Sequence, residues 1–283
     1  MGEQAQLAGE LGELLHLLGE AVQQVAAVGR VQRPGLVLAA DQQFDVGTQA
    51  GQRCTKFVTG IGSKSGDPSS VTAHGVFRAI EASAFERWGS DSLEGRTVAI
   101  QGLGHVGNHV ANELHAAGAK LIVTDIDATR IQRVVEATGA KVVALDDIYG
   151  VKADIFTPCA LGGILNDVTI PQLKVEIVAG AANNQLLSDS HGDALEARGI
   201  LYAPDYVANA GGVINVYSEL TGWSRERSLR KAGEIYTTVL SVFRLAKDKK
   251  IPTYRAADLV AEQRISEVRG MIRTWPQYPN REG

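Results

Sequence analysis

Four residues near the middle of the chain have the types and spacing of a dinucleotide-binding site. Gly102, Gly104 and Gly107 follow a short apolar run, and Asp125 lies 18 residues beyond the last glycine. The first glycine permits a tight turn, the second lets a pyrophosphate approach bare backbone, and the third lets a helix pack close to a sheet. A carboxylate at this separation in the sequence can accept hydrogen bonds from the ribose hydroxyls of a dinucleotide, and its charge disfavours a 2′-phosphate. The pattern therefore predicts NAD in preference to NADP.

This chemistry requires a strand, a helix and a second strand in that order. The apolar run at 98–101 is typical of a buried parallel strand, the apolar spacing over 106–117 predicts a helix, and Gly118 ends it. A second apolar run at 121–123 leads to Asp125. A glycine triplet alone is a weak signal, because three glycines in a turn need no ligand. Here the strand, helix, second strand and acid all stand at the expected spacing.

Further candidate residues follow later predicted strands. Cys159, Asn183 and Asn209 each come after a short apolar run, among small residues. Ligands of open parallel sheets bind outside the carboxyl ends of the strands, so this placement favours a binding role. The alternative is structural, because asparagine also favours helix N-caps.

The whole pattern predicts an α/β protein with a Rossmann-type doubly wound parallel sheet. We expect a dinucleotide-binding domain over 89–222, an atypical and reduced N-terminal substrate or oligomerisation region over 1–88, and C-terminal helices over 223–283 that pack back on the first domain. The expected strands are 98–101, 121–123, 142–144, 154–156, 175–178 and 201–204, and the expected later helices are 128–138, 229–246 and 256–272.

Composition excludes several other classes. The chain has 283 residues, 45% of them hydrophobic and 21% charged, with a formal net charge of −4. No basic cluster predicts nucleic-acid binding, and no apolar run approaches the roughly 18 residues of a membrane span. The two cysteines, Cys54 and Cys159, have no metal or redox spacing, and the acidic, glycine-broken N-terminus does not resemble a secretory signal. We therefore expect a cytoplasmic protein without a bound metal.

From about Thr55 to Arg269 the sequence resembles the glutamate/leucine/phenylalanine/valine dehydrogenase family, and the leucine dehydrogenase branch most. The resemblance is carried by long segments at 65–75, 89–95, 121–125, 156–163, 202–215 and 251–258. It implies an oligomeric enzyme of two domains that oxidatively deaminates an L-amino acid with NAD, the substrate lying between the domains.

By position, the resemblance also implies roles for single residues. Thr72 matches a residue that bonds the nicotinamide amide, Cys159 and Ala160 match the pair beside the nicotinamide ribose, and Asn183 matches a residue near that ribose. Asn209 matches a residue at the substrate's polar end. Val213 and Val216 match an apolar wall beside the substrate side chain, which would disfavour glutamate because a second carboxylate would have no partner there.

One part of the family pattern is missing from this sequence. The family carries a Gly-Gly-Gly-Lys signature and a further lysine upstream, one for the substrate carboxylate and one as catalytic base. This sequence has no lysine before Lys56. Asp45-Val-Gly-Thr48 resembles the stretch of an aspartate that assists the base, so Asp45 is the one catalytic candidate. Truncation, a frame shift or remodelling of residues 1–53 would each explain the difference.

Three hypotheses follow for the function. The first is an NAD-dependent leucine-type dehydrogenase acting on a branched-chain or other apolar amino acid. The second is a catalytically impaired NAD-binding homologue that acts as a binding or assembly protein. The third is a Rossmann oxidoreductase of other chemistry, such as a 2-hydroxy acid dehydrogenase, against which the segment at 203–212 argues.

Overall fold

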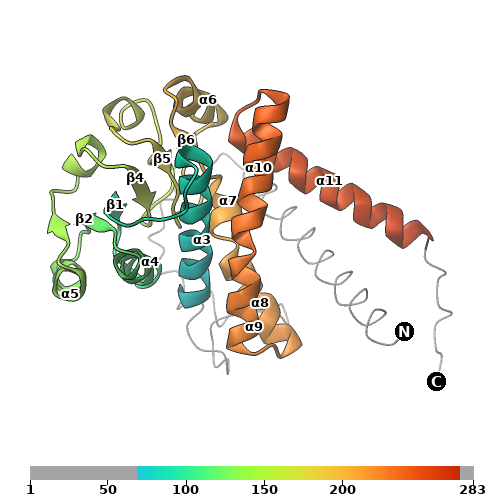
Figure 1. Ribbon diagram of the computed structural model, residues 1–283, viewed down its shortest axis with the longest axis horizontal. Coiled ribbons are helices and arrows are strands. Elements are labelled where there is room, and N and C mark those ends of the chain that lie inside the picture. The colour runs from blue at the N-terminus through green and yellow to red at the C-terminus, as the bar shows by residue number, and fades with distance from the viewer. Residues whose placement is uncertain (1–68, 275–283) are drawn as a thin grey trace, which may run out of the picture. The chain divides into compact units, whose positions relative to one another are not determined.

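The computed structural model describes residues 69–274, and its centre is a parallel sheet of six strands (Figure 1). The order is β3-β2-β1-β4-β5-β6. The strands are β1 (Thr97–Gln101), β2 (Lys120–Thr124), β3 (Lys141–Val142), β4 (Ile155–Pro158), β5 (Ile177–Val178) and β6 (Leu201–Tyr202). The strand order reverses between β1 and β4, which is where ligands of such sheets bind. The predicted α/β fold with a doubly wound parallel sheet is confirmed.

Successive side chains of the sheet enter two separate cores. Val98 and Ile100 of β1 are fully buried on one face, whereas Ala99 between them is buried on the other. β5 divides in the same way, with Ile177 on the first face and Val178 on the second. Strands buried on both faces read as continuous apolar runs, which is why their positions could be recognised in the sequence.

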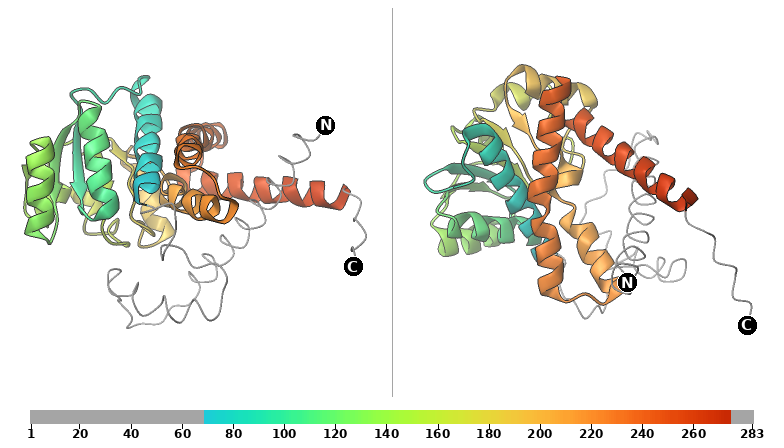
Figure 2. Two further views of the ribbon diagram at one scale, coloured as in Figure 1. Left: turned by 90° about the horizontal axis from the view of Figure 1, so that it is seen from below. Right: turned by 45° about the vertical axis from the view of Figure 1, so that its right-hand side comes forward.

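One face of the sheet is covered by α3 (Ser69–Trp88), α4 (His105–Ala116), α5 (Ala128–Thr138) and α10 (Ile235–Lys249). Figure 2 shows α5, α4 and α3 side by side, and α10 packs against α3. The opposite face carries two short 3-10 helices, η1 (Asp147–Gly150) and η2 (Ile170–Gln172), and α6 (Asp189–Ala197). Phe156 and Leu195 are fully buried in this second core.

The remaining helices are α7 (Asp205–Ala208), α8 (Gly211–Thr221), α9 (Arg225–Gly233) and α11 (Thr253–Thr274). The prediction of one helix over 229–246 was wrong, since α9 ends at Gly233 and α10 begins at Ile235. The described residues up to Ala257 belong to one compact unit, and those from Asp258 belong to a second. Within the first unit, the Thr253 hydroxyl donates to the Tyr202 carbonyl of the last strand at 2.6 Å.

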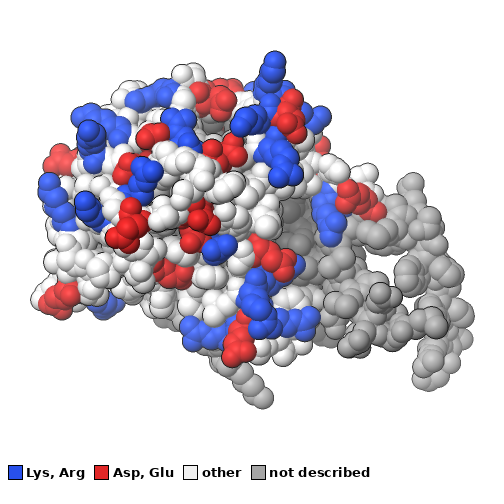
Figure 3. Space-filling model, in the orientation of Figure 1, with Lys and Arg blue, Asp and Glu red and all other residues white. Residues whose placement is uncertain are grey.

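Basic and acidic side chains are interspersed over the face of the molecule that Figure 3 shows. A mixed surface of this kind fits the absence of a basic cluster in the sequence. Among the described helices, none is long and apolar enough to cross a membrane. No group of three or more potential metal ligands was found among the described residues.

Candidate functional site

Two of the three glycines are required by close packing at the end of β1. Gly102 has a φ of +92°, and a Cβ there would lie within 2.9 Å of the Ala160 backbone. A Cβ at Gly107 would overlap the carbonyl oxygen of Gly102. Larger residues would therefore push α4 away from β1 and from the loop after β4. These contacts fit the turn and packing roles predicted for the two positions.

Gly104 differs from the other two glycines, because nothing in the described structure crowds it. It is the N-cap residue of α4 and has an ordinary φ of −63°, with no side-chain cap bond. The nearest atom to a Cβ there is Nη1 of Arg130, at 3.9 Å. Bare backbone at a helix N-terminus with open space in front of it suits the approach of a phosphate group.

Asp125 ties the end of β2 to the glycine loop. One carboxylate oxygen accepts the Leu103 N–H, and the other accepts the Asp127 N–H at 2.8 Å. The guanidinium of Arg130 lies 3.9 Å away, and only 4% of the Asp125 side chain is exposed. The carboxylate therefore stands at the predicted place beside the loop, already satisfied by backbone donors.

A cavity of about 260 Å³ opens between the glycine loop and the first turn of α5. Its wall contains two histidines, His105 and His109 of α4, and two arginines, Arg130 and Arg133 of α5. The other lining residues are Leu103, Gly104, Asn108, Asp127 and Thr129. Sequence reasoning missed this wall. The signal was present, because residues three or four apart on a helix share a face.

The loop after β4 holds Cys159 and Ala160 against the glycine loop. The Cys159 N–H donates to the Gln101 carbonyl at 2.7 Å, and Ala160 is the residue that crowds Gly102. Burial raises the pKa of the Cys159 thiol to about 12, although a backbone hydrogen bond from Ala181 acts in the opposite direction. The thiol therefore stays protonated at neutral pH and is no nucleophile.

The two predicted asparagines contact each other directly. The Asn209 side-chain amide donates to the side-chain oxygen of Asn183 at 2.6 Å and to the Ala181 carbonyl at 3.3 Å. Ala181 is also the partner of Cys159. Hydrogen bonds thus join the loops after β4, β5 and β6 into one cluster. Cys159, Asn183 and Asn209 were each predicted to follow one of these strands. Asn209 is the C-cap residue of α7, and Asn183 lies in the loop after β5.

Thr72 of α3 packs against the first turn of α8. A Cβ at Gly211 would lie 2.8 Å from the Thr72 Cα, and one at Gly212 would lie 3.4 Å from its hydroxyl. Val213 follows in α8 with 40% of its surface exposed, and Val216 is partly buried one turn later. Asp45, the predicted catalytic residue, lies outside the described residues.

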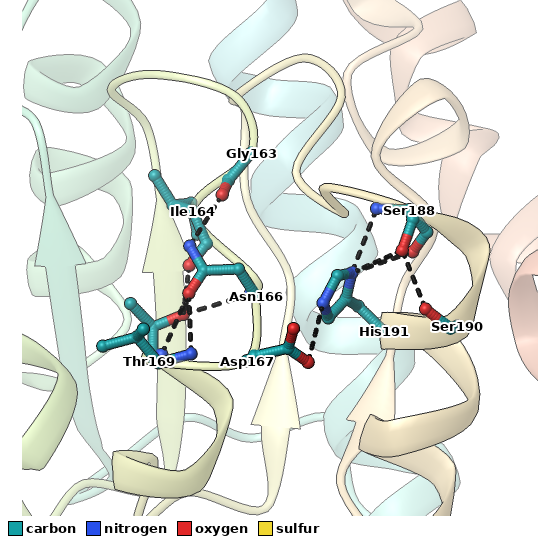
Figure 4. Close-up of polar contacts among 9 residues, drawn as sticks. Gly163, Ile164, Asn166, Asp167, Thr169, Ser188, Ser190 and His191 are labelled. Carbon is teal, nitrogen blue, oxygen red and sulfur yellow. Dashed lines mark hydrogen bonds and ion pairs between the residues drawn. The ribbon is translucent and has the colours of Figure 1, made fainter.

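A second polar cluster has the residue types of a hydrolytic triad (Figure 4). Nδ1 of His191 lies 2.8 Å from the Ser188 hydroxyl, and Nε2 lies 3.3 Å from Asp167, whose side chain is 97% exposed. However, the Ser188 N–H donates to the same Nδ1 at 3.0 Å, as in a capping box at the start of α6. A nitrogen that already accepts a backbone proton is a poor general base, so we interpret this cluster as a helix cap.

Residues 124–270 match the family described as Glutamate/Leucine/Phenylalanine/Valine dehydrogenase. The chain belongs to this family. Residues 72–161 also match the NAD binding domain of D-isomer specific 2-hydroxyacid dehydrogenases. That match covers the dinucleotide unit and not the segment at 202–215, so it reflects a shared nucleotide-binding architecture.

Several named members of the dehydrogenase family are close in sequence. The chain is 56% identical over 218 residues to a leucine dehydrogenase of Geobacillus stearothermophilus, covering 76% of this chain and 59% of the relative. It is 47% identical over 213 residues to an L-tryptophan dehydrogenase of Nostoc punctiforme, covering 75% of this chain and 60% of the relative. The crystal structure of L-tryptophan dehydrogenase from that organism matches with a TM-score of 0.71 at 46% identity, over 73% of this chain and 63% of that one. The chain thus spans about 60% of the length of these relatives.

Proposed function

We propose that the protein binds NAD(H) and belongs functionally with the dehydrogenases that oxidatively deaminate apolar L-amino acids. The observation that carries the proposal is the open backbone at Gly104, set between two crowded glycines and beside Asp125. In this proposal the first turn of α4 holds the pyrophosphate and Asp125 faces the adenosine ribose. Ile126, the next residue, is 86% exposed and supplies an apolar surface for the adenine ring.

The nicotinamide end of the dinucleotide would lie at the cluster formed by the loops after β4, β5 and β6. Cys159 and Ala160 would line its ribose, Asn183 would lie near that ribose, and Thr72 would bond the carboxamide. When bound, the cofactor supplies the acceptor for a hydride from the substrate Cα. The chain's own residues position the two carbons and exclude water from them.

The substrate end is proposed from the same cluster. Asn209 would steady the polar end of the amino acid, while Val213 and Val216 of α8 would contact its side chain. An apolar wall leaves a charged side chain unpaired, so leucine, valine, isoleucine or phenylalanine would be favoured over glutamate. With water, such a substrate and NAD⁺ give a 2-oxo acid, an ammonium ion, NADH and a proton.

A second candidate function is a cofactor-binding homologue with impaired catalysis. The observation in its favour is that the side chains of this cluster supply no base, because Cys159 has a pKa of about 12 and the asparagines are neutral amides. A base and a cation for the substrate carboxylate must come from another part of the chain. Asp45 remains the proposed assistant, and no lysine precedes Lys56.

Two measurements on one protein sample distinguish the two candidate functions. NADH binding is measured by fluorescence titration, and leucine-dependent NADH production is then measured on the same protein. We expect binding with turnover several orders of magnitude below the roughly 10 s⁻¹ typical of enzymes, because general-base assistance alone contributes about 10²- to 10⁴-fold. Turnover near 10 s⁻¹ would establish the dehydrogenase and dismiss the impaired homologue, and Lys56 and Lys64 would then be mutated first.

We also propose the division into a region over 1–88, a dinucleotide-binding domain over 89–222 and C-terminal helices over 223–283. Assembly into a homo-oligomer and a cytoplasmic location stay predictions. Sedimentation of the purified chain tests the first of these, since a single-chain mass of 30.1 kDa would contradict it.

A further inference from the structure

A fully buried glutamine ends the loop after β5. Gln185 has no exposed surface, whereas Asn183 and Asn184, the two residues before it, are exposed. Its side-chain amide donates to the carbonyl oxygens of Gly180 and Ala182, both at 3.0 Å. An oxygen in place of that nitrogen would face two carbonyl oxygens, so these acceptors determine the orientation of the amide. The side chain therefore holds the loop at 180–185 from its buried side.

The conformation of this loop requires such support. Asn184 has a φ of +51°, in the left-handed region that residues other than glycine rarely adopt. Its carbonyl accepts the Gly163 N–H at 2.7 Å, and a Cβ at Gly162 would lie 2.5 Å from the Asn183 carbonyl oxygen. A backbone in a sparsely populated conformation persists only where its surroundings hold it. Here the loop after β4 holds the exposed side and Gln185 holds the buried side.

Gln185 also connects this loop to the start of α7. Its backbone N–H donates to one carboxylate oxygen of Asp205 at 3.1 Å, and the other oxygen accepts the Tyr202 hydroxyl at 3.3 Å. Asp205 begins α7, and Asn209 is the C-cap residue of the same helix. Gln185 is therefore bonded to both elements that present the paired amides of Asn183 and Asn209.

We propose that Gln185 is a positioning residue for the nicotinamide end of the dinucleotide. The inference rests on the proposed binding of NAD(H), which assigns Asn183 to the nicotinamide ribose. Gln185 is fully buried and acts only through the loop, by fixing where the Asn183 side chain stands. Removal of its amide leaves two buried carbonyls without this donor, so the loop rearranges to satisfy them. The adenosine end, at the glycine loop and Asp125, is not affected.

The experiment compares the dissociation constants of NADH and ADP, which carries the adenosine and both phosphates but no nicotinamide. Gln185→Met keeps a side chain of similar volume without a donor. It should weaken NADH binding by about tenfold and leave ADP binding unchanged, because a lost neutral hydrogen bond with an unsatisfied partner has about this effect. Gln172→Met is the matched control, since the Gln172 amide donates to the Val168 carbonyl at 2.8 Å on the exposed surface of η2. It should change neither constant.

A double-mutant cycle tests whether the effect passes through Asn183. In Asn183→Ala the loop no longer presents the amide, so adding Gln185→Met should reduce NADH affinity by less than a further twofold. If circular dichroism shows that Gln185→Met does not fold, Asp205→Asn replaces it in the cycle. That variant keeps the size of the side chain and weakens the bond to the Gln185 N–H, so the same pattern with a smaller loss is expected.

Three results would overturn the inference and leave the proposed function standing. Equal weakening of NADH and ADP would show a general loss of structure, and unchanged NADH affinity would show that the loop needs no such support. A tenfold loss that persists in the Asn183→Ala background would show that Gln185 acts independently of Asn183. Binding of neither ligand by the unaltered chain is the different case, in which the proposed function fails as well.

Discussion

At the scale of single residues, the three glycines of the loop differ in what requires them. Gly107 is crowded by the Gly102 carbonyl, whereas the nearest atom to a Cβ at Gly104 is 3.9 Å away. The sequence presents them as equal members of one motif. Only the structure separates a glycine required by the fold from one whose open space suits a ligand.

Alanine substitutions test this difference. Gly107→Ala should lower the free energy of unfolding by about 1–3 kcal/mol, the usual range for overpacking. Gly104→Ala should lower the free energy of unfolding by less, about 0.5 kcal/mol, because alanine is a poorer N-cap than glycine but nothing lies within 3.9 Å of its Cβ, and it should weaken NADH binding. Urea denaturation and fluorescence titration measure the two effects. Equal destabilisation by both variants would contradict the assignment.

The thiol of Cys159 gives a second prediction at this scale. With a pKa of about 12, roughly one thiol in ten thousand is ionised at pH 8, so alkylation in the folded protein should be very slow. Unfolding in urea should return the thiol to an ordinary pKa and make it react within minutes. Peptide mass spectrometry after iodoacetamide treatment distinguishes it from Cys54. Rapid labelling of Cys159 in the folded chain would show that the thiol is not enclosed.

At the scale of elements, the ends of a helix were predicted best where its own capping residues determine them. The helix expected over 128–138 matches α5, because Asp127 caps its start and Gly139 ends it with a φ of +68°. α6 was not predicted, since its run of small and polar residues buries only His191, Gly192 and Leu195. The strand expected over 142–144 is shorter in the sheet and comprises Lys141–Val142, because pairing with β2 rather than hydropathy sets its length.

The candidate site was predictable to the same extent. The positions of the glycines, Asp125 and the strand-end residues beside strand ends were predicted, because strand ends can be read from the sequence, and their binding roles stay predictions. Their direct contacts, such as that of Asn183 with Asn209, could not be predicted, because they depend on how the loops after β4, β5 and β6 meet in space. The cavity wall of Arg130 and Arg133 was missed because charged residues on an exposed helix face usually indicate only solvent contact.

The cap of α6 can be tested at this scale. His191→Ala should lower the free energy of unfolding by about 1 kcal/mol, because it removes the acceptor of the Ser188 N–H at the start of the helix. Ser190→Ala is the control, since the one hydrogen bond of its hydroxyl within residues 69–274 is to the exposed Ser188 hydroxyl. Thermal unfolding followed by circular dichroism gives both values. Ester hydrolysis by the chain that is lost in His191→Ala would instead favour a catalytic cluster.

At the scale of the whole molecule, cofactor binding and folding should be linked. The residues proposed to hold NADH come from α3 and from the loops after four strands, β1, β2, β4 and β5, so the bound state requires the assembled sheet. NADH at 100 times its dissociation constant should stabilise the fold by about 2.7 kcal/mol. The melting temperature should rise accordingly, and Gly104→Ala should reduce the rise. An unchanged melting temperature at saturating NADH would mean that the site is absent.

The bond from Thr253 to the Tyr202 carbonyl has a consequence for how copies of the protein behave when crowded. Tyr202 belongs to β6, an outer strand of the described sheet, and the opposite outer strand, β3, has only two residues. Unpaired amides along a sheet edge are where a strand of another molecule adds and aggregation begins. One edge is partly covered by the first turn of α11 and the other is very short. The fold therefore leaves little edge for strand addition, even at the high concentrations of a living cell.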